Sequence, residues 1–209
     1  MRVRFDGEIA GVGTTQGTRI VVGRWLQSPF GPFADVMVER ADGHRVLLAP
    51  ARPIADFVAA TYAFDEVRVG QIELRTIPGG WQVSADDLEL TVTVGARTTL
   101  GWLLRVVPSA LAQAPAWAAT VDPLVRRTMS GVRTRGSAGQ GRREWYGALD
   151  SHRIDDAHAY WEGESLGALA PVAPPVRFGF GSTPATPSVV RVVSTVELPG
   201  PPRRPGPRR

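Results

Sequence analysis

The chain has 209 residues, enough for one domain with a substantial core, and it contains no cysteine, so disulfides and thiolate metal sites are excluded. Its net charge is +4, but four arginines lie in the proline-rich stretch 199–209, and without them the body is close to neutral. A basic face for nucleic acid is therefore not expected. No segment carries the run of about 18 apolar residues that would cross a membrane.

Two further features of the composition bear on location and chemistry. Residues 1–6 lack the apolar core of a signal peptide, so a cytoplasmic location is expected. Lysine is absent from the whole sequence, and every basic side chain is arginine or histidine. The abundance of Arg, Ala, Gly, Pro and Val is typical of a GC-rich bacterium and carries no functional meaning.

The first elements along the chain are predicted strands. Residues 3–9 form an apolar edge, and β-branched residues favour a strand over 18–25. A further strand is predicted over 35–40. Asp42-Gly43 is a two-residue hairpin signal, and 46–48 completes the hairpin.

The stretch 28–35, Ser-Pro-Phe-Gly-Pro-Phe-Ala-Asp, joins two of these strands. Its prolines and glycine fix an irregular bend. Phe30 and Phe33 supply apolar anchors, and Asp35 stands where the chain re-enters the sheet. The bend is either a rigid corner with a surface aspartate or a device that points Asp35 into a pocket.

Helical spacing appears next over 53–60. Ile54, Phe57 and Val58 share one face, and Pro53 suits the first turn. Alternation then predicts strands over 66–77, 81–84 and 88–94.

A helical excursion is predicted over 100–129, divided into short helices by Pro108, Pro115 and Pro123. The segment has a stripe of apolar residues at helical spacing. This pattern is typical of core packing, and the segment could also cap the mouth of a barrel. The stripe consists of Leu100, Leu103, Leu104, Val107 and Leu111.

The glycine- and arginine-rich stretch 131–141 lacks the Gly-Lys-Ser/Thr ending of a phosphate-binding loop. It is either a flexible hairpin or an arginine clamp for an anionic group. Strands are predicted over 144–149, 152–161 and 188–198. The stretch 199–209 is expected to be a disordered Pro/Arg-rich tail.

Strands dominate this pattern, and no regular βαβ alternation occurs. The prediction is a single mainly β domain over 1–198, an antiparallel β-barrel or sandwich with helical insertions, and not a Rossmann fold.

Candidate chemistry is sparse. No Gly-x-Ser-x-Gly elbow occurs, and there are three histidines, so a nucleophilic triad is not predicted. His152, Asp156 and His158 have no specific metal-ligand spacing, so neither a metal nor a cofactor is expected. The pool for acid–base chemistry is Asp35, Glu39, Asp65, Glu66 and Glu144. The strand-borne arginines that could face a pocket are Arg24, Arg143 and Arg177.

Three stretches resemble the acetoacetate decarboxylase family. Residues 28–35 resemble the family pattern Ser-x-aromatic/Leu-Gly-x-aromatic-x-acid, with Asp35 in the place of a pocket glutamate. The helix 53–60 precedes 61–65, where the family has Ala-Tyr-Pro-Lys-Lys. A late part, with Ala-Pro at 170–171, Pro-Val at 175–176 and Leu-Pro at 198–199, is also similar.

The resemblance implies a β-barrel or cone with an internal pocket for a small oxo-acid or related ligand. Asp35 would be the catalytic candidate. Asp35 and the residues around Tyr62 should face one cavity that Phe30 and Phe33 line or close, and at least one arginine should enter it. The binding candidates are Arg24, Phe30, Phe33, Tyr62, Phe64, Asp65, Arg143 and Arg177.

The sequence departs from the family at its reactive position. The family forms a Schiff base on a lysine, where this chain has Phe64 and Asp65, and arginine cannot replace lysine because it stays protonated. Imine-based decarboxylation is thereby excluded.

Two functional hypotheses remain: a small-molecule binding protein, and a lysine-independent enzyme of proton transfer, dehydration or lactone opening that uses Asp35 and a pocket arginine. A weaker third is a partner- or nucleic-acid-associated protein acting through the arginine-rich loop and tail. A small-molecule ligand is the expected partner, no membrane contact is expected, and a homo-oligomer is left open.

Overall fold

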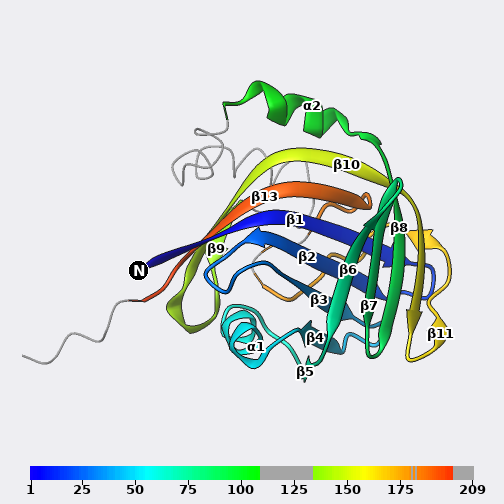
Figure 1. Ribbon diagram of the computed structural model, residues 1–209, viewed down its shortest axis with the longest axis horizontal. Helices are drawn as coiled ribbons and strands as arrows, with labels where there is room; N and C mark the ends of the chain where they lie inside the picture. Colours follow the sequence, from blue (N-terminus) through cyan, green and yellow to red (C-terminus); the bar gives the residue numbers. More distant parts are fainter. Residues whose placement is uncertain (109–133, 180, 182, 200–209) are drawn as a thin grey trace, which may run out of the picture.

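The computed structural model in Figure 1 describes residues 1–108, 134–179, 181 and 183–199. Within them lie two α-helices, α1 (Arg52–Ala59) and α2 (Thr99–Val106), and a short 3-10 helix (Gly139–Gly141). The strands are β1 (Arg2–Thr14), β2 (Arg19–Gln27), β3 (Phe33–Glu39), β4 (Arg45–Ala49), β5 (Glu66–Val69), β6 (Ile72–Ile77), β7 (Gly80–Ala85), β8 (Leu88–Arg97), β9 (Arg135–Ser137), β10 (Arg143–Trp161), β11 (Glu164–Ser165), β12 (Leu169–Ala170) and β13 (Ser188–Glu197).

All described strands belong to one sheet, whose main path has the order β5-β4-β3-β2-β1-β13-β10-β8-β7-β6; the short strands β9 and β11 pair with β10, and β12 pairs with β1. Neighbouring strands are antiparallel except β4 and β5, which are parallel because the chain passes through α1 between them. The sheet curls into a half-barrel, with β6, β7 and β8 folded across the strands β1 to β4 (Figure 1). The prediction of a mainly β fold with helical insertions is confirmed.

Period-two alternation gives the curled sheet two apolar faces. On β2, Ile20 and Val22 are fully buried in the main core, which also contains Trp81, Leu88 and Leu90 of β7 and β8. The intervening residues of β2 point to the opposite face, toward α1. The main core therefore fills the inside of the curl, and a second apolar space lies on the other side of the same strands.

Helix α1 covers part of that second face. Ile54, Ala55 and Val58 are buried against Leu47 and Ala49 of β4. Full burial of an aliphatic side chain of this size contributes about 1.5–3 kcal/mol. Pro53 occupies the first turn, where its missing N–H costs no hydrogen bond. The predicted helix over 53–60 is confirmed.

Helix α2 begins at the N-cap Thr98, whose hydroxyl accepts a hydrogen bond from the Gly101 backbone N–H at 3.0 Å. It lies along β10 (Figure 1). The prediction of core packing for its stripe is wrong for all the described members: Leu103 is 63% exposed, and Leu100, Leu104 and Val107 are only partly buried, because this side of α2 faces an open cavity and not a packed core. Residues 109–129 of the predicted excursion lie outside the described residues, as do 131–133 and 200–209 of the loop and tail.

Strand β10 merges two predicted strands, 144–149 and 152–161, into one. Its first part pairs with β13 and its second part with β8, with register shifts near Ala148 and Ile154. The strand therefore takes part in both halves of the curl, and side chains from its first part point to the sheet face that carries the second apolar space.

No helix in the described part of the chain is long and apolar enough to span a membrane.

Candidate functional site

A mostly apolar cavity of about 400 Å³ lies on the sheet face opposite the main core. Its floor consists of side chains from β1, β2, β3, β10 and β13, and its walls come from α1, α2 and residues 176, 178, 179, 181, 183 and 184. The volume falls in the range of small-molecule sites, which combine apolar walls with a few converging polar groups.

Asp35 on β3 is one of these polar groups. The residue is 1% exposed, and its Oδ1 accepts a hydrogen bond of 2.8 Å from the indole Nε1 of Trp25. Burial raises the pKa of the Asp35 carboxyl to about 7, and the hydrogen bond from Trp25 opposes that rise only in part. Near neutral pH this carboxyl is therefore present in both protonation states.

Gly23 makes room for this arrangement. It faces Asp35 across the β2–β3 ladder, and a side-chain carbon at Gly23 would collide with the carboxyl of Asp35 and the indole of Trp25. Glycine at this floor position lets the carboxyl lie flat against β2.

A second set of polar side chains is centred on Glu144 of β10. Both oxygens of this buried carboxyl accept hydrogen bonds from the Tyr62 hydroxyl, at 2.8 and 2.7 Å, and Oε1 also accepts one from Ser194 at 2.6 Å. The hydroxyls of Tyr62 and Tyr146 are 2.5 Å apart. Four side chains from the segment after α1, β10 and β13 thus form one hydrogen-bonded cluster, called here the Glu144 cluster, in which Glu144 and Ser194 are buried and the two tyrosines are half-buried.

Burial also governs the ionisation of the Glu144 cluster. Desolvation raises the pKa of Glu144, and the hydrogen bonds from Ser194 and the tyrosines oppose the rise. The pKa values of Tyr62 and Tyr146 are raised well above 10.0, first by burial and then by the nearby carboxylate, so both remain protonated. The charge of Asp35 also contributes, as the smallest of the causes, to the raised pKa of Tyr146.

Of the sequence-derived candidates, Asp35, Phe33 and Tyr62 line the cavity. Phe30 does not line it but packs on Phe33 and Phe57, with ring centroids 6.4 and 5.5 Å away, and is 38% exposed. The structure therefore brings the bend 28–35 and the segment after α1 to one place.

Phe64 and Asp65 lie away from the cavity space. The Phe64 ring packs behind Phe178, with centroids 5.6 Å apart. The Asp65 carboxylate forms a bidentate pair with Arg45 at 2.9 Å, which lowers the pKa of Asp65. Asp65 faces outward because Arg45 holds it at the start of β4.

The expectation that Arg24, Arg143 or Arg177 enters the cavity is wrong. Arg24 projects from the other face of β2 and binds Glu8 at 3.0 Å, because its neighbours Gly23 and Trp25 occupy the cavity face. Arg143 is exposed, since the adjacent Glu144 points inward. Arg177 binds Glu39. No arginine lines the cavity in the described part of the chain.

Glu39 and Arg177 instead form an ion pair with a structural role. The fully buried Glu39 carboxylate binds Arg19 at 2.9 Å, and it accepts hydrogen bonds from the backbone N–H and Nε of Arg177 at 2.8 and 3.0 Å. This pairing fastens residues 176–178 to β3. Val176 and Phe178, on either side of Arg177, form part of the cavity wall.

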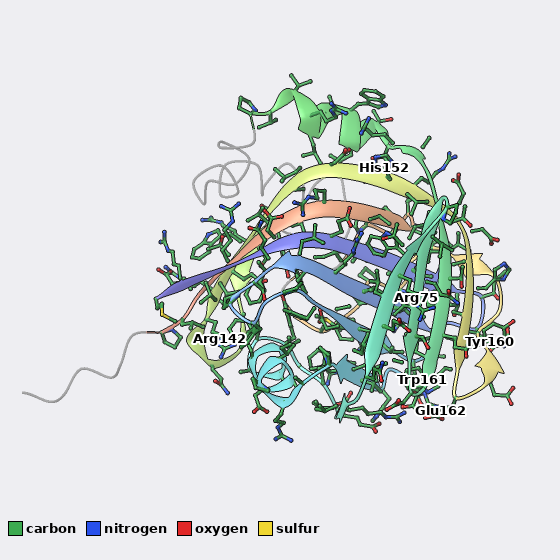
Figure 2. All side chains as sticks on the ribbon, viewed as in Figure 1. Arg75, Arg142, His152, Tyr160, Trp161 and Glu162 are labelled. Atoms are coloured by element: carbon green, nitrogen blue, oxygen red, sulfur yellow. The ribbon has the colours of Figure 1, made fainter. Side chains whose placement is uncertain are left out.

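Arg142 holds another part of the cavity wall, helix α1, in place (Figure 2). Its Nη1 donates to the backbone carbonyl of Phe57 at 2.8 Å and to the Thr61 hydroxyl at 2.6 Å, and its guanidinium lies 4.7 Å from the centre of the Phe57 ring. These bonds satisfy groups at the C-terminal end of α1 and hold the helix beside β10.

The candidate metal residues do not approach the cavity lining. His152 lies on β10 near α2 (Figure 2), where its Nδ1 is 3.2 Å from the Gly95 carbonyl. His158 pairs with Asp156 at 3.2 Å on the surface. Within the described ranges, no group of three or more His, Asp or Glu residues is arranged to hold a metal ion.

Sequence reasoning missed Tyr146 and Ser194, and it placed Glu144 only in a general pool of carboxylates. Glu144 and Tyr146 are two apart on a strand and so share a face, which was a usable signal. The pairing of β10 with β13, which places Ser194 directly opposite Tyr146, has no local signature.

The fold and the cavity define a mainly β protein with a mostly apolar, ligand-sized cavity that contains two buried carboxyl groups. No family model matches the chain, and no curated protein matches it.

Partial likeness to solved structures is shown by the following examples. One is an acetoacetate decarboxylase from Legionella pneumophila subsp. pneumophila str. Philadelphia 1, with 10% identity, a TM-score of 0.42, and coverage of 93% of this chain and 84% of that one. Another is a putative AttH from Nitrosomonas europaea, with 14% identity and a TM-score of 0.31. The match covers 94% of this chain and 51% of that one, so this chain spans about half of its length. These TM-scores are too low to establish a common family.

Proposed function

We propose that this chain is a divergent acetoacetate decarboxylase-like protein that binds a small, mainly apolar molecule in the cavity without Schiff-base chemistry. The observation that carries the proposal is the convergence of Asp35 and Tyr62, which come from two separate stretches of motif resemblance, on one cavity. The absence of lysine from the sequence removes the imine route. The apolar walls supply binding energy, and the two polar groups orient the ligand.

A cavity-filling variant tests binding. Val192 of β13 lines the cavity and is 3% exposed, so Val192→Phe should occupy space that a ligand needs. Native mass spectrometry of the purified parent should show a small molecule that dissociates on denaturation, and Val192→Phe should lose it. Val69→Phe, at a position 46% exposed on β5, is the matched control and should retain it. Equal occupancy in parent and Val192→Phe would place the molecule elsewhere and contradict the proposal.

A second candidate function is acid–base catalysis, and the raised pKa of Asp35 favours it. A general base works best when its pKa lies near the working pH, and the carboxyl of Asp35 titrates at about 7. In such a reaction the Asp35 carboxylate would take a proton from the carbon next to a ketone. The C–H electron pair would form the C=C bond of the enolate, and the π electron pair of the carbonyl would move to its oxygen.

Solvent exchange measures this chemistry directly. The parent should accelerate incorporation of deuterium from D₂O next to the carbonyl of cyclohexanone, followed by NMR. The rate should rise with pH and level off above about 7, because the ionised carboxyl is the base. Asp35→Asn should return the rate to the buffer background, whereas the surface change Asp56→Asn should not. Exchange that persists in Asp35→Asn would exclude Asp35 as the base.

A further inference from the structure

Aromatic rings form much of the cavity wall. Phe5 of β1 is one of the lining rings, with ring centroids 5.6 Å from Trp25 and 5.2 Å from Phe57, and Phe33 and Tyr62 add two more rings. The face of an aromatic ring is electron-rich and attracts cations when water is excluded. Such walls suit an apolar body that carries a positive charge.

The charged groups of the cavity have one sign. Asp35 and Glu144 line it, and no arginine or histidine lines it within the described ranges. Arg142 touches the wall from outside, but its Nη1 is used by the Phe57 carbonyl and the Thr61 hydroxyl. The cavity therefore has two buried acids and lacks a matching cation among its described lining residues.

The two acids are not equivalent. Glu144 accepts hydrogen bonds from Tyr62 and Ser194, so its carboxyl is already well solvated by the protein. The Asp35 carboxyl accepts one hydrogen bond from Trp25 and one from its own backbone N–H, although an ionised carboxylate can accept about four. Asp35 is the acid with capacity left for a ligand.

We propose that the ligand is a cation, a protonated amine with an apolar body, whose ammonium donates to the carboxylate of Asp35 while its body contacts the aromatic wall. The inference rests on the proposed binding function and names its ligand class. A bound ammonium compensates the carboxylate charge that burial otherwise disfavours, and it gains a charge-assisted hydrogen bond.

Other ligand charges fit this cavity less well. A carboxylate ligand, including an oxo-acid, would lie close to Asp35 and Glu144 in a desolvated space, with no lining guanidinium among the described residues to bind it. A neutral alcohol can donate to Asp35, but it leaves the charge of the ionised form uncompensated. Affinity should therefore follow the order amine, alcohol, carboxylate.

Three isosteric probes test the order: 2-phenylethylamine, 2-phenylethanol and phenylacetate. Calorimetric titration of the full chain at about pH 8 keeps the amine protonated, as for lysine, and ionises Asp35. The amine should bind at least about tenfold more tightly than the alcohol, as expected for a charge-assisted hydrogen bond, and phenylacetate should bind most weakly. Among the described lining residues, the other titratable groups are Glu144, Tyr62 and Tyr146, and they are unchanged across the set.

Variants separate the possible outcomes. Asp35→Asn should reduce the preference for the amine over the alcohol to within about twofold, whereas Asp56→Asn, the same charge change on the outer face of α1, should preserve it. Tightest binding of the alcohol or of phenylacetate would overturn the cation inference and leave the binding function standing. Equal amine affinity in parent and Val192→Phe would place the ammonium on surface acids and would also overturn it. If no probe binds, the cation inference fails, and the retained molecule in native mass spectrometry still decides the binding function separately.

Discussion

Asp35→Asn is expected to stabilise the folded chain above pH 7 by up to about 4 kcal/mol, with the gain disappearing near pH 4. The unfolded chain ionises this aspartate at its ordinary pKa of 3.8, whereas burial in the folded chain holds the proton up to about pH 7. The difference between these pKa values corresponds to about 4 kcal/mol. Asparagine keeps the shape and can still accept the Trp25 hydrogen bond, but it has no charge to bury.

The sign of the effect follows from proton linkage. Between pH 3.8 and about 7 the folded parent binds more protons at Asp35 than the unfolded parent does, so its free energy of unfolding falls as pH rises. Above pH 7 both states are ionised and the loss is constant. Glu144 titrates with the same sign, since its pKa is also raised, but it is present in parent and variant and cancels in their difference.

Urea unfolding of parent and Asp35→Asn at several pH values measures this difference. Asp56→Asn is the control, because Asp56 lies on the exposed side of α1 beside Arg52. A stability difference that is the same at pH 4 and pH 8 would show that Asp35 is not buried in the folded chain as the structure has it.

Glu39→Ala is expected to cause a large loss of stability, about 3–5 kcal/mol. The substitution leaves the guanidinium of Arg19, whose side chain is 6% exposed, in the protein interior without its carboxylate partner. It also removes the acceptor for the backbone N–H and Nε of Arg177, so the segment that carries Val176 and Phe178 loses its anchor to β3. Removal of one partner from a buried ion pair costs more than the pair contributes, since the remaining charge stays desolvated.

Chemical unfolding at neutral pH tests the magnitude. Asp65→Ala is the matched comparison, because Asp65 also forms a close pair with an arginine, Arg45, but at the surface. Its loss should be much smaller, since solvent screens an exposed pair. Should Glu39→Ala fail to fold, Glu39→Gln retains the shape and should still be clearly less stable than parent. Equal losses at positions 39 and 65 would contradict the buried pairing.

The parts of the fold that follow from local chemistry could be predicted from the sequence. The alternation in β7 and β8, the hairpin between β3 and β4 and the spacing of Ile54 and Val58 each depend on residues close in the chain. The loop of that hairpin has three residues, 41–43, and not the two predicted at Asp42-Gly43, because Arg40 pairs with His44 and only Gly43 has a positive φ. The motif resemblance also led to Asp35 and Tyr62. The prediction that an arginine enters the cavity was wrong, although the alternation of side chains along β2 excludes Arg24. Gly23 and Trp25 face the cavity, so Arg24, which lies between them, points to the other face of the sheet.

The Glu144 cluster could not be found in this way. Its members come from the segment after α1, β10 and β13, and their meeting depends on the order of strands in the sheet. That order places the last described strand, β13, between β1 and β10. Pairings between segments so distant in sequence are fixed by the packing of the whole sheet, and no residue pattern near Tyr146 or Ser194 predicts them.

Strand β2 contributes to two environments through residues that alternate along a single backbone. Ile20 and Val22 fill the main core, and Val21, Gly23 and Trp25 shape the cavity. The two sets therefore have separate consequences: a change at 20 or 22 alters the packing of the main core, and a change at 21 or 25 alters the shape of the cavity. The cavity can be reshaped at every second residue of β2 while the opposite side of the same backbone keeps its packing.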